Sequence, residues 1–120
     1  MATTFKNKVV SQIGTEKTEV LATDDNKRIT VVGFSLANLT EGVVLIDVHL
    51  TINPVPPDVS IRDDASTEGF YAKEMILPPN TSLRVLNGGE KLILTPNNNL
   101  YVRSNVDDSI DAVLSTVEII

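Results

Sequence analysis

The sequence has 120 residues, with 10 Lys and Arg against 16 Asp and Glu, a formal net charge of -6, and neither cysteine nor tryptophan. The missing cysteines exclude disulfides and thiolate metal sites, and the few, scattered basic residues argue against nucleic acid as the main ligand, because that binding needs clustered Lys and Arg to neutralise phosphates. A chain of this length is expected to form one domain that buries roughly two-thirds of its unfolded surface.

The N-terminal region predicts neither export nor membrane insertion. Residues 1–7 are polar and lack an apolar signal core, and no run in the chain approaches the roughly 18 apolar residues that span a bilayer. We therefore expect a flexible N-terminal arm over 1–7, a single domain over 8–120, folding in a cytoplasm, and no membrane partner.

Taken in order, the chain first predicts two short strands, over 8–13 and 18–22, followed by a polar loop over 23–27. The next stretch, Ile29 to Ile52, has the longest apolar alternation and predicts a β-hairpin with its turn at 39–42. Because successive side chains of a strand point to opposite sides, one face of this hairpin is expected to be buried. That face carries Val32, Phe34, Leu36, Val44, Ile46, Val48, Leu50 and Ile52.

Beyond the hairpin the pattern is interrupted and then resumes. Prolines at 54, 56 and 57 end the alternation, and the segment from Pro54 to Glu68 shows no period of either kind. A loop of this length is either a functional contact surface or a solvated excursion, and both interpretations stay open. Five further strands are predicted over 69–77, 82–86, 91–95, 100–105 and 109–119, with a tight turn at 87–90.

These segments predict an all-β fold. No window repeats apolar residues at helical spacing with capping signals, so essentially no helix is expected. About nine short antiparallel strands, each with an apolar face, must bury those faces against one another. We predict an antiparallel β-sandwich, jelly-roll-like, with a closed barrel as the alternative topology.

The single histidine, His49, is the first place to look for catalysis. Asp47 lies two residues earlier on the same strand face, and Ser35 on the other limb of the predicted hairpin would complete a Ser-His-Asp arrangement. No nucleophile-elbow pattern surrounds that serine. We therefore favour a polar strand face or a subunit contact, and expect no enzymatic activity and no catalytic residue.

Metal and cofactor binding are also not expected. One histidine is too few for the sites of cupin-type barrels. Calcium needs only oxygen ligands, and three acidic pairs in predicted loops, at 24–25, 63–64 and 107–108, would supply them if they converged at one end of a sandwich. None matches an EF-hand loop, so solvated acidic pairs are the simpler interpretation.

Several apolar side chains lie opposite the faces assigned to the core, and two-sided apolar strands indicate a contact with another chain. The terminal pair Ile119-Ile120 would also be poorly placed in water. Together with the polar residues of the predicted hairpin, these positions form the candidate interface: Val43, Leu45, Asp47, His49, Val113, Val117, Ile119 and Ile120.

Six segments carry a resemblance to a known family: residues 9–14 (VVSQIG), 19–21 (EVL), 29–40 (ITVVGFSLANLT), 76–83 (ILPPNTSL), 88–94 (GGEKLIL) and 110–119 (IDAVLSTVEI). They are similar to small virion proteins of tailed bacteriophages. The resemblance implies a structural protein, often a homotrimer, that acts as capsid decoration (cement) or as a tail or neck component. Its implied partners are further copies of itself and the major capsid protein or another virion protein, and its implied location is the virion, assembled in the host cytoplasm. The loop from Pro54 to Glu68 matches no shared motif.

Other functions remain open beside a capsid decoration protein. A tail, neck or fibre-associated component would share all of these sequence features. A small module that binds a glycan or host-surface ligand through its loops, and a calcium-stabilised adhesion domain, are the competitors from other classes. The scarcity of aromatic residues disfavours the glycan-binding module.

Overall fold

The computed structural model describes residues 3–52, 67–86 and 91–119. Within these ranges the chain forms nine strands and no helix, so no helix there has the length and hydropathy of a membrane span. The strands are β1 (Thr3–Ile13), β2 (Thr18–Ala22), β3 (Arg28–Asn38), β4 (Val44–Ile52), β5 (Thr67–Leu77), β6 (Ser82–Arg84), β7 (Leu92–Leu94), β8 (Asn98–Ser104) and β9 (Ile110–Ile119). Each predicted strand overlaps one of them.

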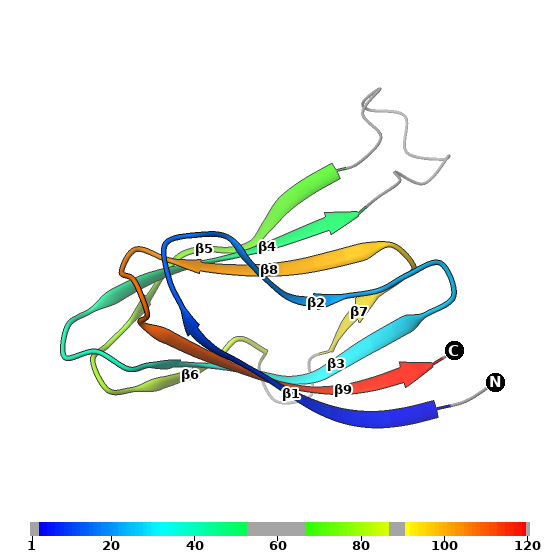
Figure 1. Cartoon of the computed structure of the whole chain (residues 1–120), viewed down its shortest axis with the longest axis horizontal. Coiled ribbons are helices and arrows are strands. Elements are labelled where there is room, and N and C mark those ends of the chain that lie inside the picture. Colours follow the sequence, from blue (N-terminus) through cyan, green and yellow to red (C-terminus); the bar gives the residue numbers. More distant parts are fainter. Residues whose placement is uncertain (1–2, 53–66, 87–90, 120) are drawn as a thin grey trace.

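The strands form two stacked antiparallel sheets (Figure 1). Sheet A has the order β1-β9-β3-β6, with β7 also paired to β3, and sheet B has the order β2-β8-β4-β5. The strands pair as they would in one long hairpin: β1 with β9, β2 with β8, β3 with β6 and β7, and β4 with β5. That hairpin is rolled so that its strands are shared between two sheets, which is the jelly-roll arrangement. The prediction of an all-β, jelly-roll-like sandwich is confirmed.

The predicted hairpin over Ile29 to Ile52 is wrong in its pairing, because β3 belongs to sheet A and β4 to sheet B. Its two apolar limbs face each other across the core instead of lying side by side. The connection over 39–43 is longer than a tight hairpin turn and crosses from one sheet to the other. This arrangement buries both apolar faces at once, which a hairpin within one sheet would not do.

The alternation along β3 contains one irregularity. The pairing of β3 with β9 shifts register between Val31 and Gly33, so the chain carries an extra residue there. Val31 is consequently buried, whereas Val32, which we predicted to be buried, is 46% exposed. Phe34 and Leu36 point into the core as predicted.

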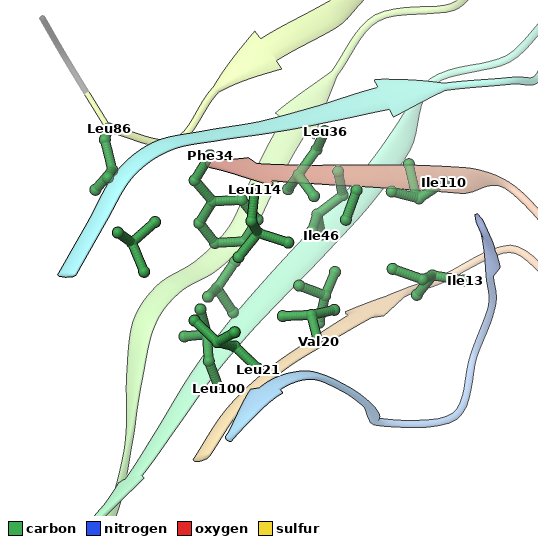
Figure 2. Packing of buried hydrophobic residues seen from close by; sticks show 14 of the residues in the cluster. Ile13, Val20, Leu21, Phe34, Leu36, Ile46, Leu86, Leu100, Ile110 and Leu114 are labelled. Atoms are coloured by element: carbon green, nitrogen blue, oxygen red, sulfur yellow. The ribbon is translucent and has the colours of Figure 1, made fainter. Parts of the chain in front are cut away.

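The core fills the space between the sheets. Figure 2 shows Phe34, Leu36 and Leu114 of sheet A packed toward Ile46 and Leu100 of sheet B. All of these side chains are buried, and Leu36, Ile46, Leu100 and Leu114 have no exposed surface. Apolar burial of this kind stabilises a fold by about 25 cal/mol per Å², so the sandwich forms a rigid body on which surface groups are fixed.

The first strand begins earlier than predicted. Residues 3–7, which we assigned to a flexible arm, pair with β9 from Thr3 opposite Ile119 onward. The edge of β9 would otherwise carry unpaired backbone groups, and pairing with β1 satisfies them. The side chains of these five residues remain exposed. Residues 1–2, residues 54–66 of the predicted loop from Pro54 to Glu68, and the predicted turn at 87–90 lie outside the described residues, whereas Thr67 and Glu68 of that loop begin β5.

Candidate functional site

The structure does not assemble the catalytic arrangement considered for Ser35, Asp47 and His49. Asp47 and His49 lie on the outer face of sheet B, because their neighbours Ile46 and Val48 point into the core. Ser35 belongs to β3 in the other sheet. A hydroxyl in sheet A on the far side of the core does not reach the imidazole, so no triad forms.

Asp47 is held by other partners. Its Oδ2 lies 3.1 Å from Arg103 Nη2, and its Oδ1 accepts a hydrogen bond of 2.8 Å from the backbone N–H of Glu74. Glu74 sits at an irregularity of the β4–β5 pairing and has a positive φ of 51°. The aspartate therefore fixes the bend of β5 against β4.

His49 is packed as a ring. Its centroid lies 4.4 Å from that of Phe70, at an interplanar angle of 41°, and its Nδ1 lies 3.8 Å from Glu68 Oε1. Among the described residues its buried Nε2 has no hydrogen-bond partner. The neighbouring glutamate is shared with Lys17, at 2.5 Å, and with the hydroxyl of Thr51, at 3.1 Å.

Glu68 thus joins His49, Lys17 and Thr51 in one polar network on the outer face of sheet B. The hydrogen bond from Lys17 lowers the pKa of Glu68, with smaller contributions from Thr51 and His49 that offset partial burial. Lys17 Nζ also lies 4.6 Å from the centre of the Tyr101 ring. Charged and aromatic groups therefore face one another in this part of the outer face of sheet B.

The acidic pairs proposed for calcium do not converge. Asp25 Oδ1 accepts a hydrogen bond from Asn97, which comes just before β8. Asp107 follows the other end of β8, and its Oδ1 accepts a hydrogen bond from Thr15. The seven residues of β8 separate these two sites by roughly 20 Å at about 3.3 Å per residue. No group of three or more acidic or histidine side chains in the described ranges is arranged to hold a metal ion. The pair at 63–64 lies outside those ranges.

A buried carboxylate that the sequence analysis missed lies between the sheets. Glu118 is 6% exposed and contacts Lys6 Nζ at 3.1 Å and Lys27 Nζ at 3.3 Å. Burial raises the pKa of this carboxyl, but the two lysine hydrogen bonds outweigh burial, and the net shift is downward. It lines a groove of about 360 Å³ between the edges of β1 and β2. The alternation along β9 signals this position, because Glu118 follows Ala112, Leu114 and Thr116 on the inward side.

The predicted interface residues fall on opposite sides of the molecule. Leu45 is partly buried in β4 and pairs with Ile76 of β5 on sheet B, and the exposed Val43 precedes that strand. Val113, Val117 and Ile119 lie on β9 and point away from the core of sheet A. The β9 residues therefore cannot share one flat contact surface with Val43 and Leu45. Ile120 lies outside the described residues.

The outer face of sheet A is the more apolar of the two. Phe5, 79% exposed, pairs with Val117, and Val9, 63% exposed, pairs with Val113. The rows continue across β3 through Thr30 and Ser35. The sequence analysis did not include Phe5 and Val9 in the candidate interface. Phe5 lies within the segment 1–7 that was predicted to be a flexible arm, and Val9 lies just after it. Charged side chains stand at the margins of this face, because Arg28 pairs with Ile119, Asp111 pairs with Ala37, and Arg84 of β6 pairs with Ser35.

Comparison with known proteins gives likenesses of fold. No protein-family model and no curated protein matches the sequence. A chain of the T13 viral particle of IBDV is similar in structure, with a TM-score of 0.54 and 8% identity, and the match covers 97% of this chain but only 30% of the viral chain. A chain of the disulfide-linked pili that form Bacillus endospore appendages has a TM-score of 0.46 and 5% identity over 97% of this chain and 86% of that chain, which is too low to support an argument. The protein thus shares its two-sheet β fold with part of a viral-particle chain.

Proposed function

We propose that this protein is a non-enzymatic virion structural protein, specifically a capsid decoration (cement) protein that acts as a homotrimer and reinforces a phage head shell. The observation that carries the proposal is a rigid jelly roll whose two outer faces both expose large apolar side chains, among them Phe5 and Val9 on sheet A and Ile76 on sheet B. A decoration protein needs two kinds of contact, one with its own copies and one with the shell.

Three further observations support a structural role. The fold is similar to part of a chain from a viral particle, and the sequence segments described above resemble virion proteins of tailed bacteriophages. In addition, the residues best suited to catalysis are engaged elsewhere, since Asp47 is paired with Arg103 and Ser35 lies in the opposite sheet. A tail or neck component would use the same features, so the experiment must separate head from tail.

Light scattering after size exclusion tests the assembly state. A homotrimer of 13.0 kDa chains has three times that mass, about 39 kDa, whereas a 13.0 kDa particle at every concentration would overturn the trimer. Co-sedimentation then tests the partner: the protein is mixed with shells of a phage major capsid protein and, separately, with purified phage tails. Binding to shells supports decoration, and binding to tails alone transfers the function to the tail or neck.

A further inference from the structure

We propose that the groove between the edges of β1 and β2 binds a small organic monoanion, namely a carboxylate that carries a short apolar chain. This binding site goes beyond the proposed virion role and does not rest on it. The groove has a volume of about 360 Å³, within the range of about 300 to 1,000 Å³ that is usual for small-molecule sites. The charges around one buried carboxylate indicate the kind of ligand.

Two lysines share this carboxylate. Glu118 is buried, and each of its oxygens contacts a different lysine: Oε2 lies 3.1 Å from Lys6 Nζ, and Oε1 lies 3.3 Å from Lys27 Nζ. One carboxylate neutralises only one of two ammonium groups. Because an ammonium group has three N–H donors, each lysine keeps donors for a second acceptor in the groove. The pair is therefore a preformed site for another carboxylate.

A third lysine in the groove has no counter-ion. Lys8 and Lys6 both belong to the inward side of β1, because they pair with the buried Leu114 and Thr116 of β9. Within the described ranges, Lys8 forms no ion pair. Its ammonium group is therefore available to an anion that enters beside Lys6.

The groove carries a net positive charge in an acidic protein. The described residues that line it include three lysines and two glutamates, which leaves one positive charge, whereas the whole chain has a net charge of -6. One of these glutamates, Glu19, is already bonded to Asn99 Nδ2 at 2.5 Å. A cleft with an excess of one sign of charge concentrates ions of the opposite sign. A monoanion balances this groove, and a cation is repelled from it.

The groove also offers apolar surface. Leu21 and Ile29 are buried and form its floor, and Ala22 lines it from the end of β2. The aliphatic stems of Lys6 and Lys8 add apolar walls below their charged ends. A ligand with a short hydrocarbon chain would bury that chain against these groups and leave its carboxylate beside the ammonium groups.

Structural roles account for only part of this arrangement. Inward-pointing lysines on an edge strand oppose the addition of another strand, which explains Lys6 and Lys8. Lys27 comes instead from the connection between β2 and β3, and Glu118 needs only one counter-ion. The surplus of ammonium groups around a hollow with an apolar floor is what a bound anion explains.

Titration of the full chain with hexanoate, followed by ¹H–¹⁵N NMR, tests the site. We expect the resonances of groove residues to shift, with a dissociation constant of about 1 mM. Acetate lacks the hydrocarbon chain and hexanamide lacks the charge, so each should bind more weakly by about 10-fold or more.

A lysine variant separates binding from folding. Lys8→Met removes the ammonium group and keeps an apolar stem, and because Lys8 forms no ion pair in the described ranges, the melting midpoint should stay the same. Hexanoate binding should weaken by about 10-fold. Lys91→Met is the matched control, since this exposed lysine precedes β7, which pairs with β3 on the side away from β9 and β1, and it should bind hexanoate as the wild type does.

Three results would overturn the proposal. Equal affinity of the wild type and Lys8→Met for hexanoate, or hexanamide binding as tightly as hexanoate, would mean that the groove does not recognise an anion. An absence of shifts in the groove up to about 20 mM hexanoate would mean that there is no site. Each of these results leaves the assembly and co-sedimentation tests of the proposed function unaffected.

Discussion

Asn38 is the residue that ties two turns of the jelly roll together. Its buried side chain places Nδ2 within 2.9 to 3.1 Å of the backbone oxygens of Gly42, Leu77 and Pro78. Its Oδ1 accepts hydrogen bonds of 2.8 Å from both the backbone N–H and the hydroxyl of Thr40. One side chain therefore fixes the crossing from β3 to β4 and joins it to the end of β5.

Replacing this residue should be costly. Asn38→Ala leaves buried backbone oxygens without a donor, and we expect a loss of about 2 to 4 kcal/mol in the free energy of unfolding. Urea denaturation measures the loss. Asn26→Ala, at an exposed position in the connection between β2 and β3, is the control and should change stability by less than about 0.5 kcal/mol. Equal effects from the two variants would contradict the role given to Asn38.

Glu118 predicts a specific loss of stability in acid. Its pKa in the folded protein is below the ordinary value of 4.5 because the lysine bonds outweigh burial, so the ionised form stabilises the fold at neutral pH. This contribution disappears as the pH falls through the folded-state pKa. We expect Glu118→Gln to lower stability at neutral pH and to flatten the decline in acid, measured by denaturant unfolding across pH.

Lys27→Met provides the companion measurement. Removing one of the two lysines should raise the pKa of Glu118, so that the acid-induced loss begins at a higher pH than in the wild type. If wild type, Glu118→Gln and Lys27→Met lose stability in parallel as the pH falls, the carboxylate does not make the contribution assigned to it.

At the scale of the element, the connection between β1 and β2 depends on a close backbone approach. A Cβ added at Gly14 would lie 3.2 Å from the Cα of Asp107 and from the backbone nitrogen of Asp108. The turn that contains Asp107 and Asp108 is held against this connection, since Asp107 accepts a hydrogen bond from Thr15. Gly14→Ala should therefore lower the melting midpoint, with a cost of about 1 kcal/mol. Gly42→Ala, which would meet nothing within 4 Å, should be nearly neutral, and a reversed order would be inconsistent with this packing.

Strand positions were predictable from sequence, but strand partners were not. Period-two alternation and turn residues located all nine strands, because these signals are local. The pairing of β3 depends on β9, more than 70 residues further on, and no local pattern reports it. The extra residue at Val32 likewise reverses the inside and outside of part of a strand, which simple alternation cannot reveal.

At the scale of the whole molecule, the separation of the acidic pairs predicts indifference to calcium. A site that binds only the folded state would stabilise it by about 2.7 kcal/mol at a ligand concentration 100 times the dissociation constant. Because Asp25 is bonded to Asn97, just before β8, and Asp107 lies just after the other end of β8, we expect the melting midpoint of the full chain to be the same with calcium and with chelator. A rise with calcium would contradict this expectation.

The candidate surfaces were only partly visible from sequence. Apolar residues opposite the core face, such as Val113 and Val117, were recognised by alternation alone. Their division between two faces follows from which strands share a sheet, and that is a property of the whole fold. Asp47 and His49 were grouped with the contact residues because they are polar and outward, although in the structure they are covered by Arg103, Phe70 and Glu68.

The place of β9 between β1 and β3 has a consequence for biosynthesis. While the ribosome is still making the chain, both neighbours of this strand are present and the strand itself is missing, so β1 is not yet joined to β3 in sheet A. Closure waits until residue 119 has left the exit tunnel. Sheet A is therefore completed late in synthesis, because its central pairs join segments far apart in the chain.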